Sequence, residues 1–228
     1  MSDGALKSKR EEREPDAGRA KLALVTGASS GIGRAFALRL GAAGYDLVVV
    51  GRRRDRLEEL VAALPEVKVQ ALVADLGTDA GVETVAAVCA REELTMLVNN
   101  AGVAHYMPFA DLPASKASEL LHVKVVAPTM LARAAVPGML ARGEGTIVNV
   151  SGMLAFSGPA PIEQLPLRRA VYTGTLAHIV ALSQALHEEL KSRASGYRRF
   201  ARASLRRSST NDKVSTSARF RGCRPMTS

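Results

Sequence analysis

The stretch "KLALVTGASSGIGRAFALRL", residues 21–40, decides the fold. Its first six residues are an apolar run that predicts a buried strand, and helical spacing of apolar residues begins at Gly31. Gly27, Gly31 and Gly33 make the turn between them rich in glycine. Such a turn lets the backbone approach a pyrophosphate, while N–H groups at the helix start point toward its charge. The combination of strand, turn and helix predicts a dinucleotide site.

The chain continues to about residue 190 as alternating strand-like and helix-like segments. Four further strands are predicted by short apolar runs at 46–51, 68–75, 95–102 and 145–152. Helical spacing predicts helices at 53–65, 79–93, 114–141 and 170–190. This order is typical of a parallel sheet covered by helices, so we expect an α/β protein.

Composition limits the class of protein. Hydrophobic residues make up 47% of the 228 residues, which is enough for a sizeable core. No apolar run approaches the roughly 18 residues of a membrane span, so no membrane is expected. Residues 1–20 mix charges with Gly and Pro and lack the apolar segment of a signal peptide, and we expect a disordered leader. Cys89 and Cys223 are isolated, which favours a cytoplasmic setting without a metal.

The formal net charge of +9 is concentrated in residues 191–228. Eleven of the 31 Lys and Arg residues lie there, but only one of the 22 acidic residues, Asp212. The rest of the chain is therefore close to neutral. The tail shows neither strand alternation nor a sustained apolar stripe of helical spacing.

Several motifs occur in an order that resembles the short-chain dehydrogenase/reductase family. They are Thr26-Gly27-x3-Gly31-Ile32-Gly33, Asp75-Leu76 after the third strand, Asn99-Asn100-Ala101-Gly102, "GTIVNVS" at 145–151, and Tyr172 in the last helix. The resemblance covers residues 21–190. It implies a Rossmann-type, doubly wound parallel sheet and hydride transfer between NAD(P) and a small-molecule alcohol or carbonyl. The cofactor-binding residues assigned with it are Gly27, Ser29, Ser30, Gly31, Ile32, Gly33, Arg52, Arg53, Asp75, Leu76, Asn99, Ala101 and Gly102.

The residues after the second strand bear on the choice of cofactor. An acidic residue there would accept hydrogen bonds from the ribose and repel a 2′-phosphate. This chain instead has Gly51 followed by Arg52, Arg53 and Arg54. Arginine holds a phosphate with paired hydrogen bonds, so NADP(H) is favoured over NAD(H), with Arg52 preferred to Arg53 as the contact. The alternative is a solvated helix start with internal ion pairs.

The resemblance implies a catalytic set of Asn, Ser, Tyr and Lys, of which only Tyr172 is retained. Leu176 stands where the pattern Y-x-x-x-K places the lysine, Gly152 stands for the serine and Lys124 for the asparagine. A tyrosine titrates near about 10 and needs a nearby ammonium to exchange protons near neutrality. Ser151 is a poor substitute, because successive strand residues point to opposite faces. We expect an intact fold with impaired catalysis.

Lys124 offers a route to partial rescue. Its ammonium would lie close to the position of the missing lysine, and we hypothesise that it serves Tyr172 from another direction. His105 and Tyr106 follow the Asn-Asn-Ala-Gly turn and could border a substrate pocket, although loop positions explain them equally well.

The tail resembles a coding sequence read in the wrong frame. The family would continue with a sixth strand, a Pro-Gly loop, a substrate-covering helix and a seventh strand, which are not recognisable after residue 190. Permitted codons for residues 194–211 can be chosen so that reading from each third base returns "VRVQALCPGIVATEFHE", which resembles that strand and loop. We hypothesise a one-frame shift near residues 191–194. The sheet should then lack its last strands, leaving the fifth as an open edge.

Three functions remain open. The first is an NADP(H)-dependent oxidoreductase with impaired catalysis. The second is a non-catalytic nucleotide-binding protein of the same fold. The third is a nucleic-acid binder, in which tail arginines interleaved with Tyr197, Phe200 and Phe220 attract RNA. Family members commonly dimerise through the fourth and fifth helices, which implies a homo-oligomer here.

Overall fold

Strands and helices alternate along the part of the chain that the structure, a computed structural model, describes: residues 21–156, 169–193 and 199–200. The strands are β1 (Lys21–Thr26), β2 (Tyr45–Gly51), β3 (Val69–Val73), β4 (Leu94–Asn99), β5 (Glu144–Asn149) and β6 (Arg199–Phe200). The helices are α1 (Gly31–Ala42), α2 (Arg54–Ala62), α3 (Asp79–Arg91), α4 (Ala114–Leu121), α5 (Ala127–Arg142) and α6 (Ala170–Arg193). Short segments are η1 (Phe109–Asp111), η2 (His122–Val126) and η3 (Met153–Phe156).

The strands form one parallel sheet in the order β3-β2-β1-β4-β5-β6. Val25 of β1 pairs with Val98 of β4, and Asn99 pairs with Asn149 of β5, so these strands end at the same edge. Strand order reverses between β1 and β4, and ligands of open α/β sheets bind at the carboxyl ends of strands at such a point. The predicted doubly wound α/β fold is confirmed.

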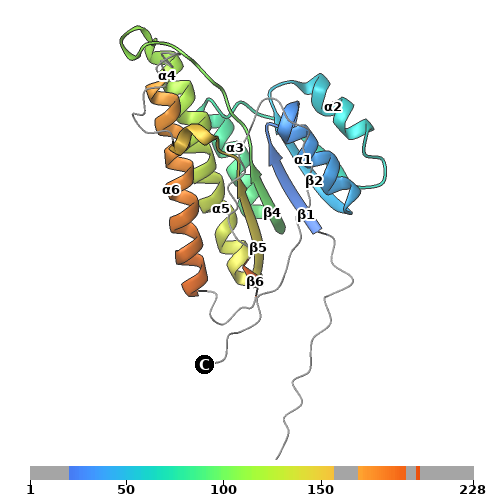
Figure 1. The fold of residues 1–228 in the computed structure, drawn as a ribbon. Coiled ribbons are helices and arrows are strands. Elements are labelled where there is room, and N and C mark those ends of the chain that lie inside the picture. The colour runs from blue at the N-terminus through green and yellow to red at the C-terminus, as the bar shows by residue number, and fades with distance from the viewer. Residues whose placement is uncertain (1–20, 157–168, 194–198, 201–228) are drawn as a thin grey trace, which may run out of the picture.

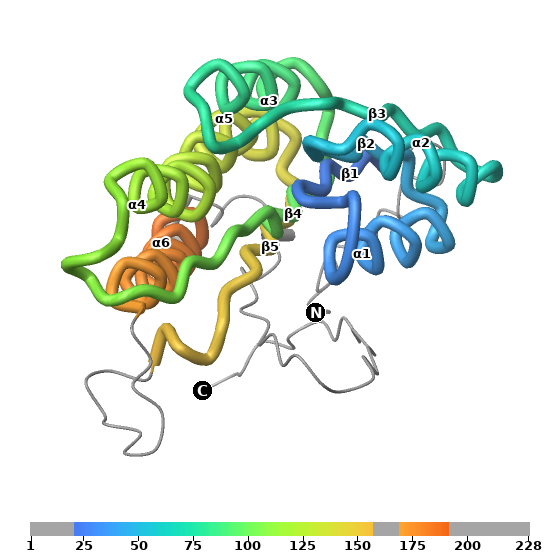
Figure 2. The backbone as a smooth tube through the Cα atoms, turned by 90° about the horizontal axis from the view of Figure 1, so that it is seen from above, coloured from blue at the N-terminus to red at the C-terminus, as the bar shows by residue number. Residues whose placement is uncertain are grey.

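Alternate residues of each strand face two hydrophobic cores, one on either side of the sheet. Leu24 and Val48 pack with residues of α3 and α5, whereas Val25 and Val49 pack with residues of α1 and α2. Figure 1 shows α3, α5 and α6 on one side of the sheet and α1 and α2 on the other. Figure 2 shows the same separation from above. Burial on both faces explains why the strands are continuous apolar runs.

Residues 114–142 form one helical stretch, and this stretch corrects the expectation that no segment is long and apolar enough for a membrane span. By length and composition it is apolar enough to cross a membrane, with a mean hydropathy of 1.3 over 18 residues. An uninterrupted apolar run is not visible in this stretch, because charged residues lie between its apolar ones. Leu131 and Met139 of α5 are fully buried in the core beside the sheet. Its apolar side chains therefore serve packing in this fold.

A π-helical turn, η2, interrupts this stretch just before Pro128. The N–H of Ala127 donates to the carbonyl of His122, five residues earlier. Pro128 has no N–H to donate, and its ring would meet the carbonyl of Lys124 four residues before it, so the preceding turn widens. Lys124 is thus carried on a widened turn at the carboxyl edge of the sheet.

Two residues of the tail form a sixth strand, although the sheet was expected to lack its last strands. Arg199 and Phe200 form β6 and pair in parallel with Glu144 and Gly145 at the start of β5. A strand of two residues is too short to show alternation in a sequence. Among the described residues, 146–149 of β5 have no strand on that side, so the predicted open edge is covered only at its beginning. The predicted leader (1–20), residues 157–168, and residues 194–198 and 201–228 of the tail lie outside the described residues.

Candidate functional site

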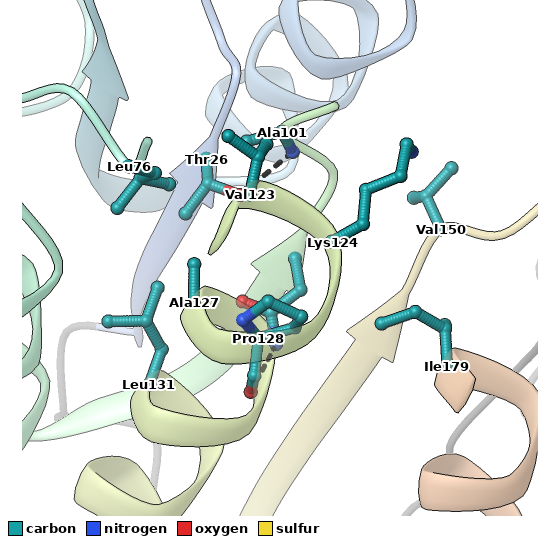
Figure 3. A pocket seen from close by; sticks show the side chains of 11 residues that line it. Thr26, Leu76, Ala101, Val123, Lys124, Ala127, Pro128, Leu131, Val150 and Ile179 are labelled. Carbon is teal, nitrogen blue, oxygen red and sulfur yellow. Dashed lines mark hydrogen bonds between the residues drawn. The ribbon is translucent and has the colours of Figure 1, made fainter. Parts of the chain in front are cut away.

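A pocket opens at the carboxyl ends of β1 and β4, where the strand order reverses (Figure 3). The space enclosed by its lining has room for about one water molecule, and the rest of the hollow is open to solvent. Its lining residues come from several strand ends, η2, α5 and α6. They include Leu76, Asn99, Ala101 and Lys124, all of which the sequence analysis assigned to a site. The fold thus brings together site residues that are far apart in the sequence.

Thr26 and Asn100 hold the glycine-rich turn. The backbone N–H of Asn100 donates to Thr26 Oγ1 at 2.9 Å, and Asn100 Nδ2 donates to the carbonyl of Thr26 at 3.0 Å. Gly27 and Gly31 have φ of +66° and +54°, in the left-handed region that favours glycine. A Cβ on Gly33 would collide with the carbonyl oxygen of Gly27. The positions of the three glycines therefore follow from the shape of the turn.

We expect Gly27→Ala to destabilise the protein strongly. A Cβ at Gly27 would lie 2.8 Å from Cα of Ala101 and 2.9 Å from Asn100 Nδ2, in addition to the left-handed backbone. Backbone strain of about 1–2 kcal/mol and crowding of about 1–3 kcal/mol should lower the free energy of unfolding in urea by about 2–4 kcal/mol. Gly31→Ala is the matched control, because a Cβ there meets nothing within 4 Å. Equal losses in the two variants would contradict the argument.

The start of α1 fits a pyrophosphate. Ser30 precedes Gly31, the first helical residue, and its side chain makes no capping hydrogen bond. The N–H groups of the first turn are therefore available to an anion, which the helix dipole also favours. A Cβ on Gly31 would enter open space, and Ile32 is 37% exposed. This end of the site therefore has both the donors and the space that a bound dinucleotide needs.

Arg53 rather than Arg52 lies against the glycine-rich turn. Arg53 Nη2 lies 2.8 Å from Ser30 Oγ and 3.1 Å from Ser29 Oγ. Arg52 Nη1 instead lies 3.4 Å from a carboxylate oxygen of Glu119 on α4. The sequence analysis preferred Arg52 as the phosphate contact. In the structure Arg52 has an acidic partner, whereas Arg53 is held by neutral oxygens at the turn.

Asp75 and Leu76, which the resemblance assigns to cofactor binding, lie at the same edge. Leu76 is 6% exposed and lines the pocket. Asp75 is exposed, and its Oδ1 accepts a hydrogen bond from the N–H of Gly77 at 2.9 Å. The same oxygen lies 4.0 Å from Arg52 Nη1, so Arg52 lies between two carboxylates. Of Asp75 and Leu76, it is therefore Leu76 whose side chain faces the pocket.

Asn99 belongs to a buried polar network. Its Nδ2 donates to Asn149 Oδ1 at 2.9 Å, and Asn149 Nδ2 donates to Ser183 Oγ at 2.9 Å. The Ser183 hydroxyl donates to the carbonyl of Ile179 at 2.7 Å. The three polar side chains are buried. Although Asn99 lines the pocket, its amide links β4 to β5 and thereby to α6, the helix that carries Tyr172.

Tyr172 lies in the first turn of α6, beside Tyr106. The two ring centroids are 5.6 Å apart, with the rings edge to face at 74°. Burial raises the pKa of the Tyr172 phenol, the charge of Tyr106 and a hydrogen bond with it raise that pKa further, and Arg169 opposes the change. The phenol is a weaker acid than a free tyrosine.

Leu176 occupies space next to the position of the missing serine. It is 2% exposed, and a Cβ on Gly152 would lie 3.2 Å from its Cδ1. Ser151 is 4% exposed, and its hydroxyl donates to the carbonyl of Leu176 at 3.1 Å. That hydroxyl links the end of β5 to α6. The serine and lysine positions of the expected set are thus filled by glycine and by packed leucine.

Lys124 reaches Tyr172 from η2. Its Nζ lies 5.4 Å from the centroid of the Tyr172 ring, a cation–π distance. A Cβ on Gly102 would lie 2.5 Å from the same Nζ, so the ammonium also lies against the turn after β4. Burial lowers the pKa of Lys124. A cation is therefore present beside Tyr172, supplied by the helix before α5 rather than by α6.

His105 belongs to an ion-pair cluster on α4. Its Nε2 lies 2.8 Å from Glu119 Oε2, and Lys116 Nζ lies 3.7 Å from the same oxygen. The hydrogen bond with His105 holds the pKa of Glu119 below its usual range. Within the described ranges, no group of three or more His, Cys, Asp or Glu residues could hold a metal. Cys89 is buried in α3, which raises the pKa of its thiol to about 12.

Sequence reasoning missed three contributions to the site: Thr26 and Asn100 as supports of the glycine-rich turn, and Tyr106 as the neighbour of Tyr172. Thr26 and Asn100 lie within quoted motifs, so a signal was present. The contact of Tyr106 with Tyr172 joins a loop and a helix far apart in the sequence and has no local signal.

The strand order, the glycine-rich turn at the switch point and the open helix start define a dinucleotide-binding α/β protein of Rossmann type. The profile described as short chain dehydrogenase matches residues 21–194. The chain belongs to the short-chain dehydrogenase/reductase family, whose members are oxidoreductases that use NAD(P).

Curated relatives include two very-long-chain 3-oxoacyl-CoA reductases. The Mycosarcoma maydis protein is 34% identical over 192 residues (81% of this chain, 53% of the relative), and the Rattus norvegicus protein is 31% identical over 178 residues (75% and 55%). The chain spans about half the length of these relatives.

Solved structures of the same family superpose on the chain. A short-chain dehydrogenase from Sphingobium yanoikuyae in complex with NADPH is 36% identical with a TM-score of 0.70, covering 76% of this chain and 66% of that one. A bulky-bulky ketone specific alcohol dehydrogenase from Comamonas testosteroni is 32% identical with a TM-score of 0.70, covering 76% and 68%.

Proposed function

We propose that this chain binds NADP(H) and reduces the carbonyl group of a small molecule slowly, because groups that assist proton transfer are replaced. One observation carries the proposal: the start of α1 is open to a pyrophosphate and has Arg53 at its edge. Beside it, Gly152 and Leu176 stand at the serine and lysine positions of the catalytic set. The NADPH complex and the reductase names among the relatives support the cofactor and the carbonyl substrate.

Separate residues would hold each part of the cofactor. The first turn of α1 would bind the pyrophosphate, Arg53 with Ser29 and Ser30 the 2′-phosphate, and Leu76 the adenine. When bound, the nicotinamide supplies the hydride that reduces the carbonyl carbon. Tyr172 occupies the position of the family's proton donor, and burial makes it a weak acid.

A second candidate function is nucleotide binding without turnover. It is favoured by the contact between Leu176 and the position of Gly152, since a Cβ there would lie 3.2 Å from Leu176 Cδ1 and a serine would fit only if Leu176 shifted. The NADP(H) cradle is the same in both candidates, and only the chemistry at Tyr172 differs.

Titration with NADPH followed by nicotinamide fluorescence tests the binding, and NADPH oxidation with acetoacetyl-CoA or benzil tests the turnover. We expect saturable binding together with slow reduction. Binding with no turnover would favour the second candidate, and no binding would remove both.

We expect Arg53→Gln to weaken NADPH binding far more than NADH binding. Loss of charge-assisted hydrogen bonds to the 2′-phosphate costs about 1.5–3 kcal/mol, so the dissociation constant for NADPH should rise by about 10- to 100-fold. Arg52→Gln is the control, because Glu119 and Asp75 already neutralise Arg52, and its effect should be smaller. A larger effect from Arg52→Gln would restore the preference drawn from the sequence.

Three further proposals concern the chain as a whole. We propose a homo-oligomer through the long helices, supported by exposed Leu121 on α4 and Met130 on α5, and a cytoplasmic location, supported by the unpaired thiol of Cys89. We also propose that the residues from about 194 onward arise from a shifted reading frame. The nucleic-acid candidate depends on tail residues outside the described ranges.

A further inference from the structure

Among the described residues that line the pocket, Lys124 alone has a charged side chain. The other lining residues are apolar, apart from Thr26, whose hydroxyl holds the glycine-rich turn, and Asn99, whose Nδ2 donates to the buried network while its Oδ1 has no hydrogen-bond partner among the described residues. Figure 3 shows the Lys124 side chain extending toward Val150 at the end of β5. A ligand oxygen entering this pocket would therefore meet one cationic donor.

The turn after β4 is shaped to admit this ammonium. A Cβ on Gly102 would lie 2.5 Å from Lys124 Nζ, so any other residue at 102 would displace the lysine. Ala101, beside it, lines the pocket. The ammonium thus lies at the rim of the turn where the strand order reverses, the point at which open α/β sheets bind their ligands.

Tyr172 presents its ring to Lys124. Lys124 Nζ lies 5.4 Å from the centroid of the Tyr172 ring, and the phenol hydroxyl of Tyr172 forms a hydrogen bond with Tyr106. Burial acts in opposite directions on the two groups: it raises the pKa of the phenol and lowers that of the ammonium. Both changes favour Lys124 over Tyr172 as the proton donor.

We propose that Lys124 binds the carbonyl oxygen of the substrate and donates the proton that completes its reduction, with Tyr172 as the aromatic surface that holds the ammonium in place. This inference rests on the proposed function. As the carbonyl carbon accepts a hydride from the reduced nicotinamide, the π electrons of the C=O bond form an O–H bond with a proton from Nζ. The N–H electrons remain on nitrogen, the ketone becomes an alcohol, the dinucleotide is oxidised, and the neutral amine regains a proton from water.

The test compares Lys124→Met with Lys124→Arg, using Lys68→Met at the start of β3 as the matched control. Positioned acid catalysis contributes about 10²- to 10⁴-fold, so Lys124→Met should lower kcat by at least about 10²-fold and leave the dissociation constant for NADPH unchanged. Lys124→Arg should also lose kcat, because guanidinium does not give up its proton. Tyr172→Phe should lower kcat less than Lys124→Met does.

An equilibrium measurement separates binding of the oxygen from proton transfer. Benzoate, a charged probe for the carbonyl oxygen, should bind to the protein with NADP⁺, with a dissociation constant about 10-fold higher in Lys124→Met and nearly unchanged in Lys124→Arg. In the parent, kcat should fall as pH rises through the pKa of Lys124, which lies below its ordinary range. Among the described residues, Tyr172, Tyr106 and Arg169 lie at this end of α6, and His178 further along α6 has its Nε2 3.1 Å from Thr129 Oγ1 beside η2.

The outcomes keep the two proposals apart. Failure to bind NADPH overturns the proposed function. NADPH binding with no ketone reduction in the parent, or equal kcat and equal benzoate affinity in the parent and Lys124→Met, overturns the role of Lys124 and leaves the cofactor site standing.

Discussion

Replacing Gly152 with Ser, Leu176 with Lys and Lys124 with Asn in one chain is expected to raise kcat/KM for ketone reduction by about 10²- to 10⁴-fold. The substitutions rebuild the expected set around Tyr172. The restored serine polarises the carbonyl, and the restored ammonium lowers the pKa of the phenol, opposing the effect of burial. Lys124→Asn also removes the proton donor proposed above, so any gain in this variant must come through Tyr172.

Gly152 and Leu176 must be changed together. Gly152→Ser alone brings a new Cβ to 3.2 Å from Leu176 Cδ1, so its hydroxyl would meet an apolar side chain. Leu176→Lys alone places an ammonium where a 2%-exposed leucine was packed, without a hydroxyl nearby. We expect each single change to raise kcat/KM by less than about 10-fold, with the gain appearing only in combination.

Steady-state NADPH oxidation measures the gain, and thermal unfolding measures its cost. Burying an ammonium in place of Leu176 should lower the free energy of unfolding by about 2 kcal/mol or more. Adding Tyr172→Phe to the triple variant is the control, and it should abolish the gain. A triple variant that folds, binds NADPH and reduces ketones no faster than the parent would show that Tyr172 is not poised for proton transfer.

The sequence predicted what local patterns determine. The apolar run of β1, the glycines of the turn and the spacing of α1 lie within twenty residues, and the structure joins them as expected. The doubly wound sheet was predictable for the same reason, since each strand is a continuous apolar run between helices. The position of Lys124 beside Tyr172 followed from aligning two motifs.

Side-chain direction was not predictable from the same patterns. Arg52 and Arg53 are adjacent in the sequence, and only the fold shows that Glu119, from a distant helix, pairs with the first while the second reaches Ser30. The inward turn of the Asn99 amide depends on Asn149, which comes from another strand. Contacts of this kind depend on tertiary packing.

Changing the sequence after residue 193 to the reading frame that we propose is expected to raise the melting temperature by about 10 °C. The described β6 pairs Arg199 and Phe200 with the start of β5, within the stretch that the shifted frame converts into "VRVQALC". That peptide alternates apolar and polar residues and could pair along β5 as far as Asn149. Several new backbone hydrogen bonds of about 1 kcal/mol each, with one or two buried apolar side chains, would supply about 3–5 kcal/mol.

The coding DNA provides the first measurement, because reading it one frame away from residue 194 should return "VRVQALCPGIVATEFHE" or a close variant. Calorimetry of the parent and the frame-restored chain provides the second. A chain whose tail is replaced by Gly and Ser residues of equal number is the matched control, since it removes the basic residues without adding a strand. If that control melts as high as the frame-restored chain, charge repulsion in the tail explains the gain. A DNA frame that encodes an unrelated peptide would contradict the frame shift itself, because the open edge of β5 would then belong to the protein as encoded.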